Sequence, residues 1–172
     1  MRHAIASLLL TVLLTGCGTI AFTPTEYPLR DGLIPAFDVA GAVKISNAQP
    51  STEPVIVYSF GGSQLSSDLK AITEVMVQQA NKELQKNGHP KTGAFAAKSI
   101  SIKVNSLLSR YIAFYWKSTI EFEATFGNGQ TITLTVPHSS GILQQDLNGC
   151  IAEGVLTLFR DERVKAYLAS AT

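Results

Sequence analysis

The 172-residue sequence is poor in charged residues and in residues that bind metals. Charged side chains make up 16% of the chain, against about 25% in an average globular protein. The 14 lysines and arginines are balanced by 13 aspartates and glutamates, so no basic excess favours nucleic-acid binding. The two cysteines and three histidines do not show the spacing of a zinc site. We therefore expect no nucleic-acid partner, no metal and no cofactor.

Long hydrophobic runs are missing except near the N-terminus, where Ala4–Leu14 follows a short basic start. A membrane-spanning helix needs about 20 apolar residues, so this stretch predicts a secretory signal. The segment LTGC at positions 14–17 resembles the lipobox of bacterial lipoproteins. The resemblance implies a signal peptide over residues 1–16. It also implies that Cys17 carries diacylglycerol on its thiol and a further acyl chain, such as palmitate, on its freed amine.

This anchor has consequences for location and for the second cysteine. In enteric-type lipoproteins an aspartate directly after the lipidated cysteine retains the protein at the inner membrane, and Gly18 stands at that position here. The resemblance therefore implies attachment to the outer membrane, with the domain in the periplasm. Because Cys17 is then modified, Cys150 has no intramolecular disulfide partner. Its place in a helical pattern predicts a small buried thiol.

No hydrophobic period is visible between the anchor and the first strand pattern. Three prolines interrupt residues 17–37, which predicts an extended, lipidated tether. This segment has more aromatic and aliphatic residues than a spacer requires, so we expect part of it to lie on the domain surface. The remaining residues, 38–172, have the length of one domain with one core.

Alternating apolar and polar residues predict strands in the first and middle parts of the domain. The strands predicted in this way cover residues 38–47, 100–109, 114–126 and 131–136. The short β-rich run at residues 55–60 is either a second strand or a continuation of the first past a bulge. The last two predicted strands are joined by FGNGQ, whose glycines and asparagine favour a hairpin turn. Pro137–Gly141 is expected to form a loop.

Apolar residues at helical spacing predict two main helices. The first runs from about residue 69 to the Asn87-Gly88 pair, which supplies a left-handed end, and the second covers residues 143–158. Ser66 or Ser67 is expected to cap the first helix, and Asp161 a short last helix.

This order of elements predicts an α+β protein with an antiparallel sheet of four to five strands and two main helices packed on one face. The longer strands place apolar residues on one face and Thr, Ser, Lys and Glu on the other, which is typical of a sheet covered on one side. Gly149 and Gly154 lie inside the second helix. Close packing of that helix on the sheet would explain both glycines.

Candidate catalytic residues do not form a recognisable set. His138 precedes two serines and a glycine, but a nucleophile elbow needs glycine on both sides of its serine. Ser139 or Ser140 is therefore expected to cap the following helix. Glu121 and Glu123 share a polar sheet face without evident walls that would raise a pKa, so we expect a solvated surface. We assign no catalytic residue and no metal ligand.

Aromatic residues cluster at positions 111–116, near the start of the longest predicted strand. Uninterrupted alternation places Tyr111 and Tyr115 together on the polar face. Aromatic side chains on such a face are typical of binding surfaces, so this pair is our candidate binding patch. The alternative is two isolated exposed tyrosines, which are common on protein surfaces.

Several features, taken in order, resemble the YajG-type envelope lipoproteins. They are the helix ending near Asn87-Gly88, the serine-rich strand after it, the long strand running into FGNGQTITLTV and the last helix running into RDERVKAYL. The resemblance extends over about residues 39–168. A more distant resemblance is to LptE, the lipoprotein that plugs the lipopolysaccharide translocon. What the resemblance implies is a non-enzymatic α+β lipoprotein of the outer membrane, and it transfers no functional residue.

We therefore expect a non-catalytic binding or assembly module that docks on a partner protein or a glycolipid of the cell envelope. Two alternatives stay open. One is a hydrolase acting on cell wall or lipid, with His138, Ser140 or Glu121 in its site. The other is a structural subunit of an envelope transport or secretion complex. A deep pocket joining two of those three residues would favour the hydrolase.

Overall fold

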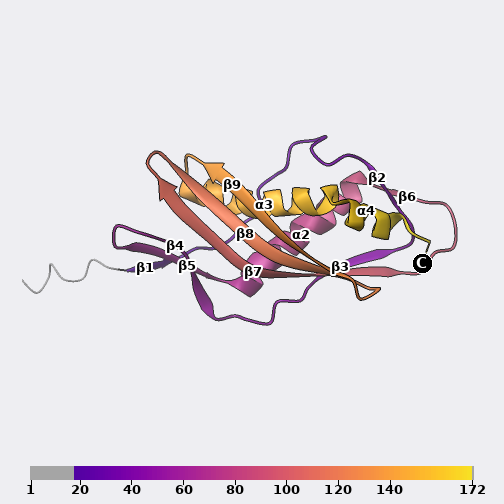
Figure 1. The fold of residues 1–172 in the computed structure, drawn as a ribbon, viewed down its shortest axis with the longest axis horizontal. Coiled ribbons are helices and arrows are strands. Elements are labelled where there is room, and N and C mark those ends of the chain that lie inside the picture. Colours follow the sequence, from indigo (N-terminus) through magenta and orange to yellow (C-terminus); the bar gives the residue numbers. More distant parts are fainter. Residues whose placement is uncertain (1–17, 172) are drawn as a thin grey trace, which may run out of the picture.

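The computed structural model describes residues 18–171 (Figure 1). The predicted signal peptide and Cys17 lie outside the described residues. In chain order the elements are β1 (Thr19–Ala21), β2 (Phe37–Val39), β3 (Val43–Asn47), β4 (Pro54–Phe60), β5 (Ser63–Asp68), α2 (Leu69–Asn87), β6 (Gly88–Pro90), β7 (Lys98–Ile112), β8 (Tyr115–Phe126), β9 (Thr131–Ser140), α3 (Leu143–Arg160) and α4 (Glu162–Ala169). Within the described part of the chain, no helix is long and apolar enough to cross a membrane.

The α+β class and the helices on one face of the sheet are confirmed, but the sheet is larger than predicted and mixed. Seven strands form it, in the order β1-β5-β4-β7-β8-β9, and β3 also pairs with β7. The β7–β8 and β8–β9 ladders are antiparallel, whereas β3 and β4 run parallel to β7, and β1 to β5. Because side chains alternate in the same way in both kinds of ladder, the sequence pattern did not reveal the parallel pairs.

Two predicted segments are built differently. The strand expected over residues 38–47 is divided at Gly41, whose φ of 84° turns the chain, so that β2 pairs with the short β6 in a separate two-stranded sheet. Residues 63–68, where no strand was predicted and Ser66 or Ser67 was expected to cap α2, form β5 in a hairpin with β4. The cap of α2 is Asp68, whose Oδ1 accepts from the backbone N–H of Ala71 at 2.7 Å. Gly88 ends this helix with a φ of −81°, so the left-handed end is not formed.

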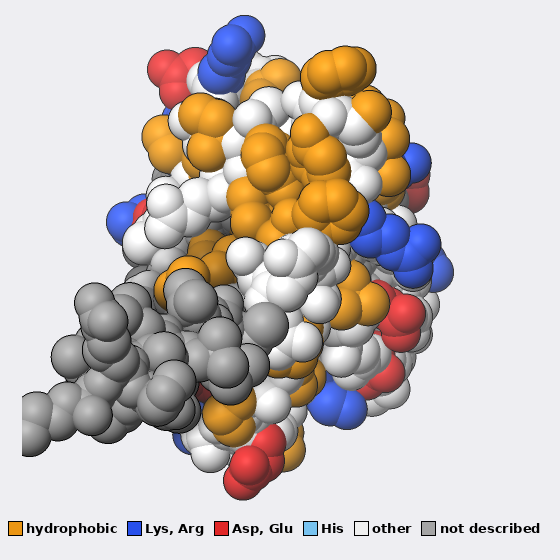
Figure 2. All heavy atoms as spheres, turned by 90° about the vertical axis from the view of Figure 1, so that its left-hand side faces the viewer, with side chains coloured by type: hydrophobic (Ala, Val, Ile, Leu, Met, Phe, Trp, Pro, Cys, Tyr) orange, Lys and Arg blue, Asp and Glu red, His pale blue; other side chains and the backbone are white. Residues whose placement is uncertain are grey.

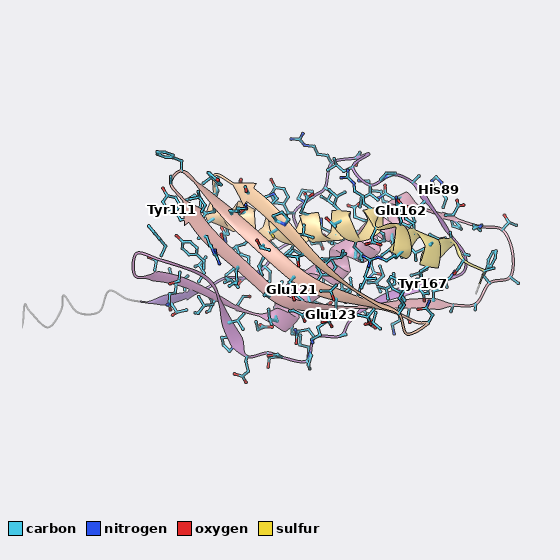
Figure 3. All side chains as sticks on the ribbon, in the orientation of Figure 1. His89, Tyr111, Glu121, Glu123, Glu162 and Tyr167 are labelled. Carbon is cyan, nitrogen blue, oxygen red and sulfur yellow. The ribbon has the colours of Figure 1, made fainter. Side chains whose placement is uncertain are left out.

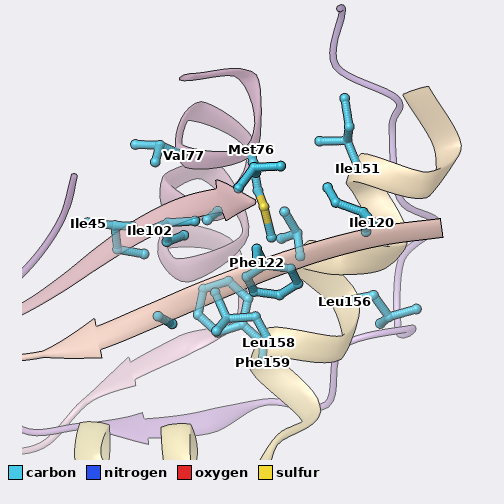
Figure 4. Close-up of a cluster of buried hydrophobic side chains, with 14 of the residues drawn as sticks. Ile45, Met76, Val77, Ile102, Ile120, Phe122, Ile151, Leu156, Leu158 and Phe159 are labelled. Atoms are coloured by element: carbon cyan, nitrogen blue, oxygen red, sulfur yellow. The ribbon is translucent and has the colours of Figure 1, made fainter. Parts of the chain in front are cut away.

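Helices α2 and α3 lie side by side on one face of the sheet, as Figure 1 shows. The hydrophobic core lies between these helices and the sheet. Figure 4 shows Phe122 of β8 at its centre, next to Met76 from α2 and Phe159 from α3. A Cβ atom at Gly154 would lie 3.1 Å from the Met76 side chain and 3.4 Å from Phe122. The predicted close packing at this glycine is therefore confirmed.

Residues 18–37 lie along the domain instead of standing clear of it as a tether. Thr19–Ala21 is already part of the sheet, and Phe22 and Ile34 are buried in the core. Further along, the backbone N–H of Thr25 donates to Oδ1 of Asn148 on α3 at 3.0 Å. The packed domain thus begins with β1, directly after the predicted anchor, and not at residue 38.

A buried lysine links two segments of the chain at the end of the molecule that lies farthest from β1. The Nζ of Lys98, the first residue of β7, donates to the carbonyl oxygens of Ala40 at 2.7 Å, Leu168 at 3.1 Å and Ser170 at 2.6 Å. Burial lowers the pKa of Lys98, and the nearby charge of Lys91 adds to this effect. The ammonium group fixes the chain before β3 and the end of α4 to the central strand.

Replacing this lysine tests its structural role. Lys98→Met is expected to reduce the free energy of unfolding by about 1–3 kcal/mol, because buried carbonyls lose their donor. Lys103→Met is the matched control in the same strand, on the face away from the helices, and should change it by less than about 0.5 kcal/mol. Urea denaturation measures both, and equal effects would contradict this assignment.

Candidate functional site

The face of β7, β8 and β9 that points away from the helices forms a groove of about 510 Å³. Its lining residues are Ser106, Leu108, Arg110, Ile112, Lys117, Thr119, Glu121 and Thr135. We call this surface the open face. Leu108 lies across from Thr119, and Arg110 across from Lys117. The open face therefore combines a half-exposed leucine with side chains of both charges.

Leu108 reaches the open face because the register of β7 shifts between Val104 and Ser106. This β-bulge reverses the side-chain alternation of the strand beyond it. Uninterrupted alternation along the strand would place Leu108 on the same face as the core residues Ile100 and Ile102. The bulge instead brings Ser109 to the helix-covered face.

A row of polar residues crosses the otherwise apolar face beneath the helices. Ser109 of β7 pairs with Ser118 of β8, which in turn pairs with His138 of β9. All three meet Asp146, a fully buried residue in the first turn of α3. Asp146 Oδ2 accepts from the Ser109 hydroxyl at 2.8 Å and from the Ser118 hydroxyl, and its Oδ1 lies 3.3 Å from His138 Nδ1. We call these four residues the Asp146 cluster.

The loop predicted at residues 137–141 is not formed, because β9 continues to Ser140. Pro137 is tolerated there because β9 is the last strand of the sheet, where a missing N–H breaks no ladder bond. Helix α3 begins after Ile142, which makes no side-chain capping bond. The prediction that Ser139 or Ser140 caps this helix is therefore wrong.

The His138 ring packs against α3 at Gly149, the other glycine for which the sequence predicts close packing. A Cβ atom at Gly149 would lie 2.5 Å from the imidazole Cε1, so only glycine lets the ring lie there and reach Asp146. The close-packing explanation of Gly149 is confirmed, although its neighbour is a histidine and not an apolar side chain. His138 also lines a groove with Glu153, residues 27–30 and Leu33.

The residues weighed for a hydrolase are not brought together. His138 lies on the helix-covered face, whereas Glu121 lies on the open face, so these two line different grooves. Ser140 is among the lining residues of neither groove. In the Asp146 cluster the serines contact the carboxylate and not the imidazole, which is not the order of a catalytic triad. Its geometry serves to join four elements.

The remaining candidates have ordinary environments. Figure 3 shows Glu121 and Glu123 along the strands, and Glu123 accepts from the Asn105 side-chain amide at 3.0 Å. Among residues 18–171, no three His, Cys, Asp or Glu side chains are grouped so that they could hold a metal ion. Cys150 is buried as predicted, its Sγ lies 3.5 Å from the Val136 carbonyl oxygen, and burial raises the pKa of its thiol far above the usual range.

The expectation that Tyr111 and Tyr115 share one face is wrong. Tyr115 pairs with Ile112 and lies on the open face, whereas Tyr111 pairs with Trp116 on the other face. The bulge in β7 is the cause, because it reverses the alternation before Tyr111 is reached. The Tyr111 ring packs 5.1 Å from Trp116 and 5.2 Å from Phe60 of β4.

Comparisons with known proteins identify only a distant structural likeness. No protein-family model matches the chain, and a search of curated proteins finds no significant match. Among solved structures, the chain is similar to the hypothetical protein CT253 from Chlamydia trachomatis, with 10% identity and a TM-score of 0.42. The similarity covers 74% of this chain and 98% of that protein.

The contact between Gly149 and His138 can be tested by a double-mutant cycle. Gly→Ala in a helix interior normally stabilises by about 1 kcal/mol, but Gly149→Ala is expected to destabilise this protein because the added methyl group displaces the imidazole from Asp146. In a His138→Ala background the same substitution should become neutral or stabilising.

Thermal unfolding of the four proteins measures this coupling. Gly154→Ala is the control, because its neighbours are core side chains and not His138, and its effect should not depend on the His138→Ala change. Additive effects of Gly149→Ala and His138→Ala would contradict the proposed contact.

Proposed function

We propose that this chain is an outer-membrane-anchored periplasmic lipoprotein that acts as a non-catalytic binding module. The lipobox ending at Cys17 and the resemblance to YajG-type lipoproteins support the anchor and the location. The part of the open face around Leu108, Thr119 and Glu121 is the surface that docks on a partner protein. Its groove is large enough for several side chains of a partner.

The observation that carries this proposal is the position of Leu108. It is 49% exposed and lies in the groove between the basic pair Arg110–Lys117 and the acidic Glu121. Non-obligate protein interfaces likewise combine an apolar centre with a polar rim.

Site-specific crosslinking in cells tests the docking surface. A photo-reactive amino acid at Thr119, directly across from Leu108, is expected to capture one defined protein, which mass spectrometry identifies. Leu108→Glu should abolish that capture, because a charge would be buried in the centre of the interface. The control position is Gln78, an exposed residue of α2.

Capture of the same protein from Gln78, or capture from Thr119 that survives Leu108→Glu, would refute the open face as the docking surface. A glycolipid in place of a protein would appear as a crosslinked product without peptide. A repeating ladder of the chain's own mass would instead favour the structural-subunit alternative.

The anchor is tested separately. Cys17→Ala is expected to leave the precursor uncleaved and without acyl chains, because the thiol is the acceptor of the diacylglycerol. Metabolic labelling with a fatty-acid analogue and the mass of the protein measure both effects. Normal cleavage in this variant would overturn the proposed attachment, and Cys150→Ala is the control that should be processed normally.

A further inference from the structure

We propose that one end of the molecule lies against the lipid bilayer and inserts apolar side chains into its interfacial layer. This end is formed by the β4–β5 and β7–β8 turns. Its apolar residues, which we call the end patch, are Phe60, Tyr111, Ile112, Phe114, Tyr115 and Trp116. The inference rests on the lipidation of Cys17 in the proposed function, but it assigns a second, protein-borne contact with the membrane.

The tip of the end patch is strongly exposed, and its residues Phe60, Ile112 and Tyr115 are 57%, 40% and 42% exposed. Phe114 at the tip of the β7–β8 turn is 91% exposed, and ring contacts of 5.2 Å and 5.1 Å join Phe60, Tyr111 and Trp116 across the two hairpins. Figure 2 shows hydrophobic side chains gathered in the middle of this end. Contiguous apolar patches on a folded domain mark sites of contact with membranes or other proteins.

The position of the anchor decides in favour of the membrane. Thr19 pairs with Gln64, and the neighbouring Ser63 pairs with Phe60 of the end patch. Cys17 precedes Thr19 by two positions, and an extended chain spans at most about 3.6 Å per residue. An acylated Cys17 is therefore held within about 7 Å of Thr19. Since no free tether follows it, the bilayer must lie close to this end of the domain.

The chemistry of the end patch also fits a lipid interface. Tryptophan and tyrosine concentrate where the hydrocarbon core meets the headgroups. On the open face, Arg110 and Lys117 lie one step behind Ile112 and Tyr115, which is about 7 Å along a strand. Neither basic residue forms an ion pair within residues 18–171. Their long side chains can therefore reach lipid phosphates while the tip occupies the apolar layer.

Trp116 is the only tryptophan of the chain, so its fluorescence reports directly on the end patch. The experiment uses the full-length protein as the cell processes it, reconstituted into vesicles of phosphatidylethanolamine and phosphatidylglycerol. One preparation carries bromine on the acyl chains and the other does not. We expect Trp116 to lose emission in the brominated vesicles only, because bromine quenches an indole that it approaches.

Two matched substitutions show whether the quenching comes from insertion of the end patch. Ile112 and Ile56 are 40% and 41% exposed, but Ile56 lies in β4 away from the tip. Ile112→Asp and Phe114→Asp are expected to restore the emission of Trp116, because a charged tip is expelled from the apolar layer. Ile56→Asp should leave the quenching as it is in the unchanged protein.

Two results would overturn the proposal: wild-type emission that is equal in both kinds of vesicle, and quenching that Ile112→Asp and Ile56→Asp change alike. A protein that fails to float with the vesicles would instead overturn the lipid anchor of the proposed function. Quenching lost together with a crosslinked dimer would assign the end patch to a second copy of the chain. Failure of the proposed partner surface is distinguishable, because it removes capture from Thr119 and leaves the bromine effect unchanged.

Discussion

The fold depends on the burial of one carboxylate, that of Asp146, beneath the first turn of α3. A buried charge is tolerated only where donors surround it, and here each donor comes from a different strand of the sheet. Ser109, Ser118 and His138 form one straight row across β7, β8 and β9. Because a slip of one residue turns a side chain to the other face of the sheet, the carboxylate is satisfied in one register only. The same contact fixes where α3 meets the sheet.

This row also marks where the helical cover of the sheet ends. On one side of it, α2 and α3 cover apolar side chains such as Ile120 and Phe122. On the other side lie Tyr111 and Trp116, and ring contacts join Tyr111 to Trp116 and to Phe60. The end patch therefore lies on the far side of the Asp146 cluster from the main core. At the opposite end of β7, the Lys98 ammonium group also joins separate elements, by donating to three carbonyl oxygens.

The parts that depend on regular periodicity could be predicted from the sequence. They include β8, most of β7, both long helices, the Asp161 cap and the reason for Gly154. The departures have local physical causes that leave no clear trace in composition. A bulge near Asn105 places Leu108 on the open face and Tyr111 on the opposite face, the reverse of what uninterrupted alternation predicts. A positive φ at Gly41 divides one predicted strand into two. Asp146 was missed because an acidic residue in a first helical turn is explained by the helix dipole alone. The available signal was Ser118, a polar residue on the apolar face of β8, together with Ser109, which reaches the same face once the bulge in β7 is allowed.

The packing of residues 18–37 changes how the domain is presented in the proposed function. A long tether would let the domain rotate freely above the membrane, whereas a domain that begins at Thr19 keeps one end at the bilayer. Moving away from that end along β7 and β8, the open face carries Ile112 and Tyr115, then Arg110 and Lys117, then Leu108 and Thr119, and then Ser106 and Glu121. The first two pairs match the apolar layer and the phosphates of a membrane in turn. The next two face water and remain free for a protein. The lipid contact and the docking groove then follow one another along β7 and β8, starting from the anchored end of the domain. A partner bound at Leu108 would be held close to the membrane surface.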